Sequence, residues 1–116
     1  MFKDIFGNTP QTKVLDFLLE HPDYDYNISD IAQNSKVSRP TTYKVVDTLL
    51  EKKLIVKTRE SGQSSFFKLN LENSLVRVIL KFDFEVASKV AELEAQATVK
   101  KYKPVLVSAK AKSVPV

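Results

Sequence analysis

The segment from Ser29 to Leu69 constrains the fold of this chain more than any other part of its sequence. Two short stretches with apolar residues at helical spacing are joined by a polar turn at 34–36. Residues rich in β-branched and aromatic side chains then predict strands at 54–59 and 65–69, with a loop containing Gly62 between them. We therefore predict two helices separated by a tight turn, followed by a β-hairpin.

The second of these helices is the most clearly marked element. Ser38 is a suitable N-cap, and Pro40 falls in the first turn, where its missing N–H costs little. Steps of three, four and seven residues then place one broad face toward the core, made of Thr42, Val45, Val46, Leu49 and Leu50. Val37, just before the helix, is expected to plug the core. The residues that lie off this face near the helix N-terminus are Arg39, Thr41, Tyr43 and Lys44.

The residues before this unit are expected to be scaffold. Residues 1–7 predict a short helix, and Thr9-Pro10 predicts the start of a longer one that ends at His21-Pro22. Residues 23–28 alternate polar and apolar side chains and predict a short strand that pairs with the hairpin. Ser29 is the expected N-cap of the following helix.

After Asn70 a helical pattern without Gly or Pro runs to about Ala97. Its first apolar strip is close to a heptad seam and comprises Leu75, Ile79, Phe82, Val86, Val90 and Leu93. A second strip contains Val76, Leu80 and Phe84. Two strips predict that one side covers the domain and the other meets a second copy in a homodimer; the alternative is that the helix packs only on its own core. The predicted division is thus a domain at 1–70, a dimerisation helix at 71–99 and a flexible tail at 100–116.

The formal net charge of +4 is unevenly distributed along the chain. Residues 28–70 carry eight basic and four acidic side chains, and residues 100–116 carry five Lys and no acid. The remaining residues, 1–27 and 71–99, are net acidic. This arrangement favours a polyanion as partner, with solubility as the competing explanation.

Composition argues against several other classes of protein. The chain has no Cys, one His and two Gly, so we expect no disulfide, no metal site, no glycine-rich phosphate loop and no cofactor. Its carboxylates are scattered, so we expect no catalytic residues and no enzyme. No signal peptide or membrane-length apolar run is present, and a soluble cytoplasmic protein is the expectation.

The string V-S-R-P-T-T-Y-K-V-V-D-T-L-L-E-K-K-L-I, from Val37 to Ile55, resembles the recognition-helix segment of winged helix-turn-helix transcription regulators. The likeness is to the MarR-like and ArsR-like groups and their archaeal relatives, and it covers about Thr9 to Leu69 and, more loosely, the helix that follows. The family usually has Gly where this chain has Lys53 and an apolar residue where it has Thr42. The Cys and His ligands of metal-sensing relatives are absent, and no polar cluster marks an effector pocket.

The resemblance implies a mainly α fold with a small β-hairpin and a long C-terminal dimerisation helix. It also implies a homodimer that binds double-stranded DNA sequence-specifically and regulates transcription. Helix insertion into the major groove suits the outward residues, and the hairpin wing would reach flanking phosphates or the minor groove. The expected DNA-binding residues are Lys36, Ser38, Arg39, Pro40, Thr41, Tyr43, Lys44, Arg59 and Gln63. Two alternatives remain at this stage: a low-specificity chromatin-type DNA-binding protein and a winged-helix module for protein–protein interaction.

Overall fold

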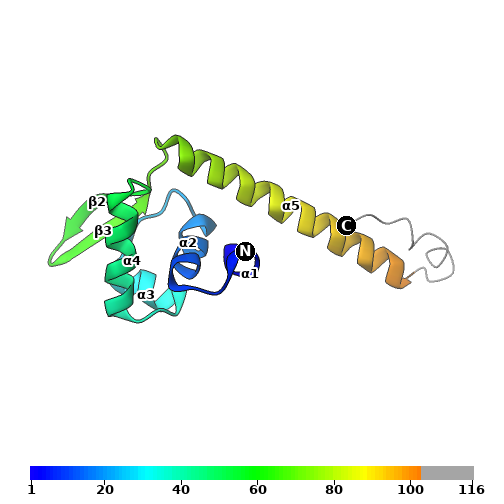
Figure 1. The fold of residues 1–116 in the computed structure, drawn as a ribbon, viewed down its shortest axis with the longest axis horizontal. Coiled ribbons are helices and arrows are strands. Elements are labelled where there is room, and N and C mark those ends of the chain that lie inside the picture. Colours follow the sequence, from blue (N-terminus) through cyan, green and yellow to red (C-terminus); the bar gives the residue numbers. More distant parts are fainter. Residues whose placement is uncertain (103–116) are drawn as a thin grey trace. The chain divides into compact units, whose positions relative to one another are not determined.

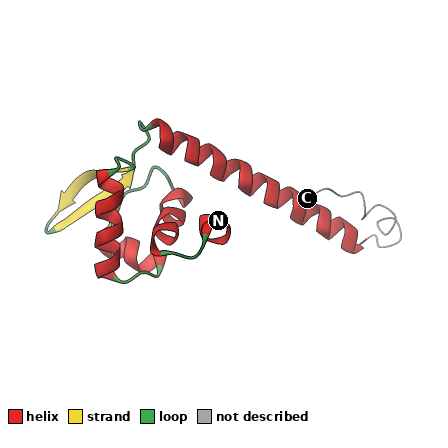
Figure 2. Ribbon diagram, viewed as in Figure 1, coloured by secondary structure: helices red, strands yellow, loops and turns green. Residues whose placement is uncertain are grey.

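The computed structural model describes residues 1–102, and Figures 1 and 2 show its arrangement of helices and strands. The helices are α1 (Phe2–Phe6), α2 (Pro10–Glu20), α3 (Ile28–Ser35), α4 (Arg39–Glu51) and α5 (Ser74–Tyr102). The strands are β1 (Tyr26–Asn27), β2 (Ile55–Ser61) and β3 (Ser64–Leu69). The chain divides into one unit at Met1–Asp83 and another that begins at Phe84. The predicted fold, mainly α with a small β element and a long last helix, is confirmed.

Helix starts follow from side chains that satisfy free backbone N–H groups. Thr9 and Thr12 form a reciprocal capping box at α2, and the Ser38 hydroxyl caps α4 as predicted. The prediction that Ser29 caps α3 is wrong. The Asn27 side-chain oxygen instead accepts the Asp30 N–H at 2.8 Å, so α3 begins at Ile28 and Ser29 lies within its first turn.

Two lysines end helices in the left-handed conformation that usually favours glycine. Lys36 closes α3 with φ 58°, and the Val37 N–H donates to the Ala32 carbonyl at 3.0 Å. Lys53 follows α4 with φ 60°, so a lysine adopts the left-handed conformation at the position where the resembling family usually has Gly. Its strain costs about 1 to 2 kcal/mol, and the side-chain amides of Asn70 and Asn73 donate to its carbonyl at 3.0 and 2.9 Å.

The wing is longer than the sequence predicts. The three strands are antiparallel in the order β1-β3-β2. The strand expected at 23–28 pairs with the hairpin as predicted, but it covers only Tyr26–Asn27 because α3 begins at Ile28. The loop predicted at 60–64 is wrong in extent, because pairing continues to Ser61 and Ser64 and leaves a two-residue turn at Gly62-Gln63. Gly62 takes φ 62° in that turn. A bulge between Lys57 and Arg59 adds Thr58 to β2 without a partner on β3.

The core lies where α2, α3 and α4 meet one face of the sheet. Helix α4 contributes Thr42, Val45, Val46 and Leu49, all buried, and Val37 packs beside them half-buried. Burying each large apolar side chain contributes about 1.5 to 3 kcal/mol. The start of α5 belongs to the same core, because Val76 is 1% exposed and Ile79 and Leu80 pack against it. No helix in the described part of the chain combines the length and apolar character that crossing a bilayer requires.

Candidate nucleic-acid interface

Helix α4 presents a continuous solvent-facing stripe opposite its buried face. The exposed residues recur at helical spacing: Arg39, Pro40, Tyr43, Lys44, Asp47, Thr48 and Glu51. Thr41 is half-buried, and its hydroxyl is bonded to the Ser38 hydroxyl at 3.0 Å, within the cap. The structure therefore brings together on one surface the predicted residues of this helix, with Thr41 at the margin.

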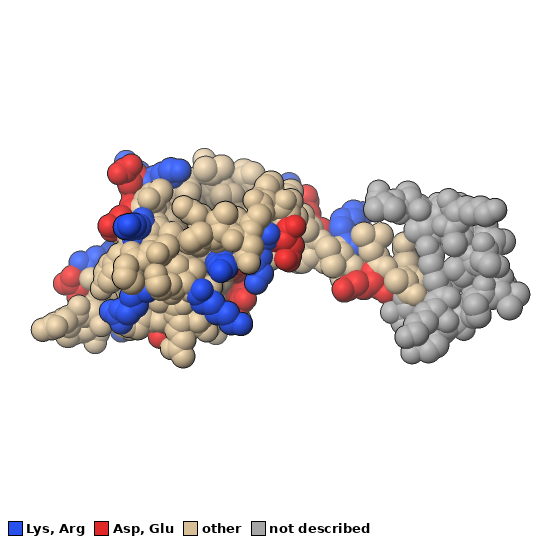
Figure 3. Space-filling view, turned by 60° about the horizontal axis from the view of Figure 1, so that its bottom comes forward, with Lys and Arg blue, Asp and Glu red and all other residues tan. Residues whose placement is uncertain are grey.

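The N-terminal end of α4 and the turn before it lie at the lower side of Figure 1. Lys36, exposed in that turn, adds a positive charge beside Ser38 and Arg39. Figure 3 brings this side forward and shows several Lys and Arg side chains standing among uncharged surface. Exposed cations gathered on one side of the domain suit contact with a row of phosphates.

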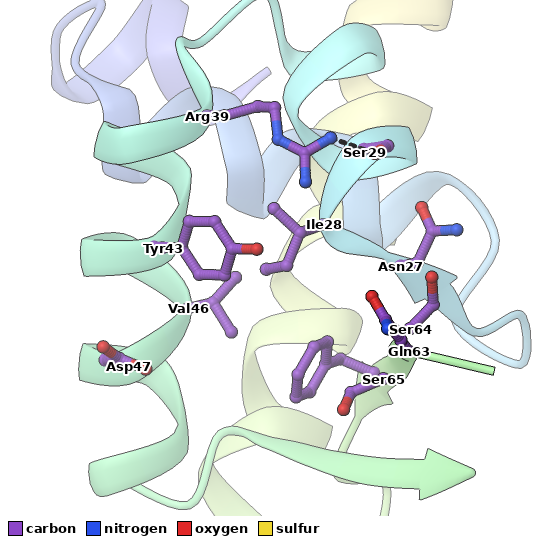
Figure 4. A pocket seen from close by; sticks show the side chains of 11 residues that line it. Asn27, Ile28, Ser29, Arg39, Tyr43, Val46, Asp47, Gln63, Ser64 and Ser65 are labelled. Atoms are coloured by element: carbon purple, nitrogen blue, oxygen red, sulfur yellow. Dashed lines mark hydrogen bonds between the residues drawn. The ribbon is translucent and has the colours of Figure 1, made fainter. Parts of the chain in front are cut away.

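A hollow of about 250 Å³ separates α4 from the start of α3 and the tip of the wing. Figure 4 shows Arg39, Tyr43 and Asp47 in succession along α4, with Asn27 and Ser29 across from them and Gln63 at the wing tip. Most of the polar atoms at its rim belong to exposed side chains. The hollow joins α4 to the wing as one concave surface.

The Arg39 guanidinium spans the upper end of this hollow. Its Nη1 donates a hydrogen bond to the Ser29 hydroxyl in the first turn of α3 (Figure 4). The first turn of a helix exposes backbone N–H groups that attract anions. Arg39 thus places a positive charge at this point of the rim, beside the first turn of α3, which also carries Asp30.

In the wing, Arg59 is already engaged by other groups of the domain. Its Nε lies 3.0 Å from the Asp25 carboxylate, and its guanidinium carbon lies 3.9 Å from the centre of the Phe66 ring. The Thr58 hydroxyl donates to the same carboxylate at 2.6 Å. These contacts attach the wing to the segment before β1. Gln63, at the turn, is exposed and borders the hollow.

The engagement of Asp25 changes its ionisation. Hydrogen bonds from Arg59, the stronger influence, and from Thr58 lower the pKa of the Asp25 carboxyl below its usual range. The hydrogen bond with Asp25 in turn raises the pKa of Arg59. Because the folded-state pKa is depressed, the contact stabilises the fold at pH values above the ordinary aspartate pKa. That contribution is lost as the pH falls through the lowered value.

Sequence reasoning missed three residues of this surface: Asp25, Ser29 as a partner of Arg39, and Asp47. Asp25 is 34 positions away from Arg59, so no local pattern connects them. Asp47 was detectable, because it continues the outward spacing of Tyr43 by one turn. Among the described residues no group of three or more His, Cys, Asp or Glu is arranged to hold a metal ion.

Only some residues of the apolar strip predicted as a dimer interface are exposed to solvent. Ile79 and Val86 are half-buried, and the Phe82 ring lies 5.8 Å from that of Phe2, centre to centre. The members that remain exposed are Leu75, Phe82, Val90 and Leu93, at 54, 40, 46 and 42%. An exposed apolar series on one helix is uncommon without a covering partner.

Comparison with known proteins identifies the fold. No family model matches the chain, and no curated protein matches its sequence. Among solved structures, the adhesin competence repressor AdcR of Streptococcus pyogenes superposes with TM-score 0.61 at 13% identity, over 87% of this chain and 77% of that one. The apo form of a Lactococcus lactis ZitR mutant superposes with a TM-score of 0.59 at 17% identity, over 91% of this chain and 87% of that one.

MepR, a transcription regulator of the Staphylococcus aureus multidrug efflux pump MepA, gives a TM-score of 0.58 at 19% identity, over 93% of this chain and 83% of that one. At identities this low the likeness is one of fold. The chain folds as these winged-helix proteins do, in agreement with the resemblance noted in its sequence.

We predict that Arg59→Gln raises the pKa of Asp25 toward the ordinary aspartate value, because it removes the hydrogen-bond donor that lowers this pKa most. The measurement is an NMR titration of the Asp25 side-chain carboxyl in both proteins. Lys57→Gln is the matched control, since Lys57 pairs with Glu60 in the same hairpin and leaves Asp25 alone. An Asp25 titration that is identical in the Arg59→Gln protein would contradict the assignment.

Proposed function

We propose that this protein is a homodimeric, sequence-specific DNA-binding regulator of transcription, with α4 in the major groove and the wing on the flanking backbone or minor groove. The observation that carries the proposal is the concave surface formed by the exposed stripe of α4, the start of α3 and the wing tip. A helix fits the major groove, and its N-terminal residues reach base edges. Two of the similar structures are named as a transcription regulator and a repressor.

The residues of α4 have distinct roles in this proposal. Arg39 clamps a phosphate together with the first turn of α3, a role supported by its bond to Ser29. Tyr43, which is 49% exposed, reaches a phosphate through its hydroxyl or packs its ring on a thymine methyl. Lys44 supplies a positive charge to the DNA backbone one turn into the helix. Pro40 and Thr41 are compact, so they allow the helix backbone to approach the DNA closely.

Residues outside α4 extend the contact to the neighbouring backbone. Lys36 and Ser38 meet a phosphate at the turn, where Lys36 has no ion-pair partner among the described side chains of residues 1–97. Gln63 reaches toward the minor groove from the wing tip. Arg59 contributes only as far as Asp25 releases it, because its guanidinium is paired in the free protein.

A single winged unit reads few base pairs, so specificity benefits from two copies. Two recognition helices about one DNA turn apart, roughly 34 Å, match an inverted repeat. The exposed apolar residues of α5 support pairing through this helix. They sit beside acidic and basic residues such as Lys89 and Glu92, which are paired at 3.3 Å and can flank a helix–helix seam.

We predict that Lys44→Ala weakens binding to unrelated duplexes and to a selected duplex alike, and lowers the slope of log affinity against log salt by about 1. One fewer phosphate is neutralised in the variant, so one fewer counterion is released. Binding is measured by fluorescence anisotropy at several salt concentrations. Lys81→Ala, which removes an exposed lysine on α5, serves as the control with unchanged slope. Affinity that does not respond to salt at all would refute DNA binding.

For the dimer, we expect the double substitution Val90→Glu and Leu93→Glu to shift the full chain to monomer in sedimentation velocity. Burying a carboxylate in place of either apolar side chain costs several kcal/mol, which weakens association more than a hundredfold. Ser88→Glu, on the opposite side of the same helix, is the control and leaves the dimer intact. The full chain must be used, because Val76 of α5 is part of the domain core. A monomeric parent protein would rule out the dimer.

A further inference from the structure

Asp47 is the acidic exception on the surface proposed to face DNA. It lies on the exposed stripe of α4, one turn beyond Tyr43 and two beyond Arg39, and it borders the hollow that Gln63 closes on the wing side (Figure 4). Glu51, one turn further along the same stripe, does not line the hollow. Asp47 is thus the carboxylate that α4 places on the border of the hollow.

Among the side chains that the structure describes, those of residues 1–97, none forms an ion pair or a hydrogen bond with the Asp47 carboxylate. Other carboxylates of the domain are engaged: Asp16 accepts the backbone N–H of Phe2 at 2.7 Å, and Asp25 holds Arg59. A free carboxylate in this position repels phosphates, so it weakens DNA binding unless something on the DNA compensates.

The compensation must be a hydrogen-bond donor on a base edge, because an ionised carboxylate only accepts. In the major groove, guanine presents the acceptors O6 and N7, and thymine presents O4 beside its methyl group. Adenine offers its N6 amino group next to the N7 acceptor, which faces the second carboxylate oxygen unfavourably. Cytosine presents its N4 amino group without an adjacent acceptor, and it alone satisfies the carboxylate.

We infer that Asp47 is a specificity-determining residue that accepts a hydrogen bond from the N4 amino group of a cytosine in the major groove. The inference rests on the proposed function and deepens it by assigning one base to one residue. Asp47 lies eight positions after Arg39, about 12 Å along the helix, so this cytosine lies on the wing side of the contact that Arg39 makes. The residue contributes discrimination between sequences rather than affinity for DNA.

The test begins with selection of bound duplexes from random DNA by the full chain, followed by the same selection with Asp47→Ala and Asp47→Asn. We expect one position of each half-site to be cytosine for the parent protein. That preference disappears with Asp47→Ala and moves to adenine with Asp47→Asn, because an amide pairs with adenine N6 and N7. Asp47 is exposed, so both variants are expected to fold, and circular dichroism checks this.

Affinity measurements make the same test quantitative. Replacing the selected cytosine by thymine should weaken binding of the parent protein about 5- to 150-fold, and that of Asp47→Ala less than about twofold. Asp47→Ala should also bind unrelated duplexes more tightly than the parent does. Glu51→Gln is the matched control: it removes one negative charge from the same stripe and should leave the base preference unchanged.

Three results would overturn the inference. A parent protein that binds no duplex removes the proposed function and this inference together. Sequence-specific binding with the same base preferences in Asp47→Ala leaves the proposed function standing and rejects the role of Asp47. A loss of the cytosine preference in Glu51→Gln equal to that in Asp47→Asn shows an effect of net charge alone and likewise rejects it.

Discussion

Burial of one face of α4 is the constraint on which the rest of this surface depends. Thr42, Val45, Val46 and Leu49 are each less than a tenth exposed and pack on α2, α3 and the sheet. Thr42 is fully buried, and it is compatible with the core because its hydroxyl donates to the Ser38 carbonyl at 2.8 Å within the same helix. Burial of these four residues fixes the rotation of α4 about its axis, and the helical period then determines which residues face outward. The direction in which the exposed residues of α4 leave the helix is therefore set by the packing of its buried face.

The charged groups around this stripe are not equally available to a partner. Arg39 is turned toward Ser29 and Arg59 is paired with Asp25, whereas Lys36 and Lys44 have no ion-pair partner among the side chains described, those of residues 1–97. The free lysines suit phosphate contacts that depend on charge alone, and the held arginines suit contacts that depend on geometry. In the wing, Asp25 and Phe66 hold the Arg59 guanidinium in one direction in the free protein, so Arg59 meets a partner only as far as Asp25 releases it.

Much of the fold and part of the site could be predicted from the sequence because they depend on local patterns. The caps at Thr9 and Ser38 and the apolar period of α4 are set within one or two turns of chain. The errors have tertiary causes. Asn27 and Ser29 are both good N-caps, and only the pairing of β1 with β3 places Asn27 at the helix start. The extra length of the wing and the Asp25–Arg59 contact depend on strands that meet only after folding. Asp47 was overlooked for another reason: DNA-binding residues were sought among basic and neutral polar side chains, and this search leaves out a carboxylate.

We propose that the start of α3, the exposed stripe of α4 and the wing together bind double-stranded DNA. An NMR titration of the isotopically labelled full chain with the duplex recovered by selection tests this directly. We expect the largest backbone amide shift changes at residues 28–30, 36–48 and 59–65, with α2 little affected. Changes confined to α1, α2 or α5, with the amides of α4 unmoved at saturating DNA, would contradict it.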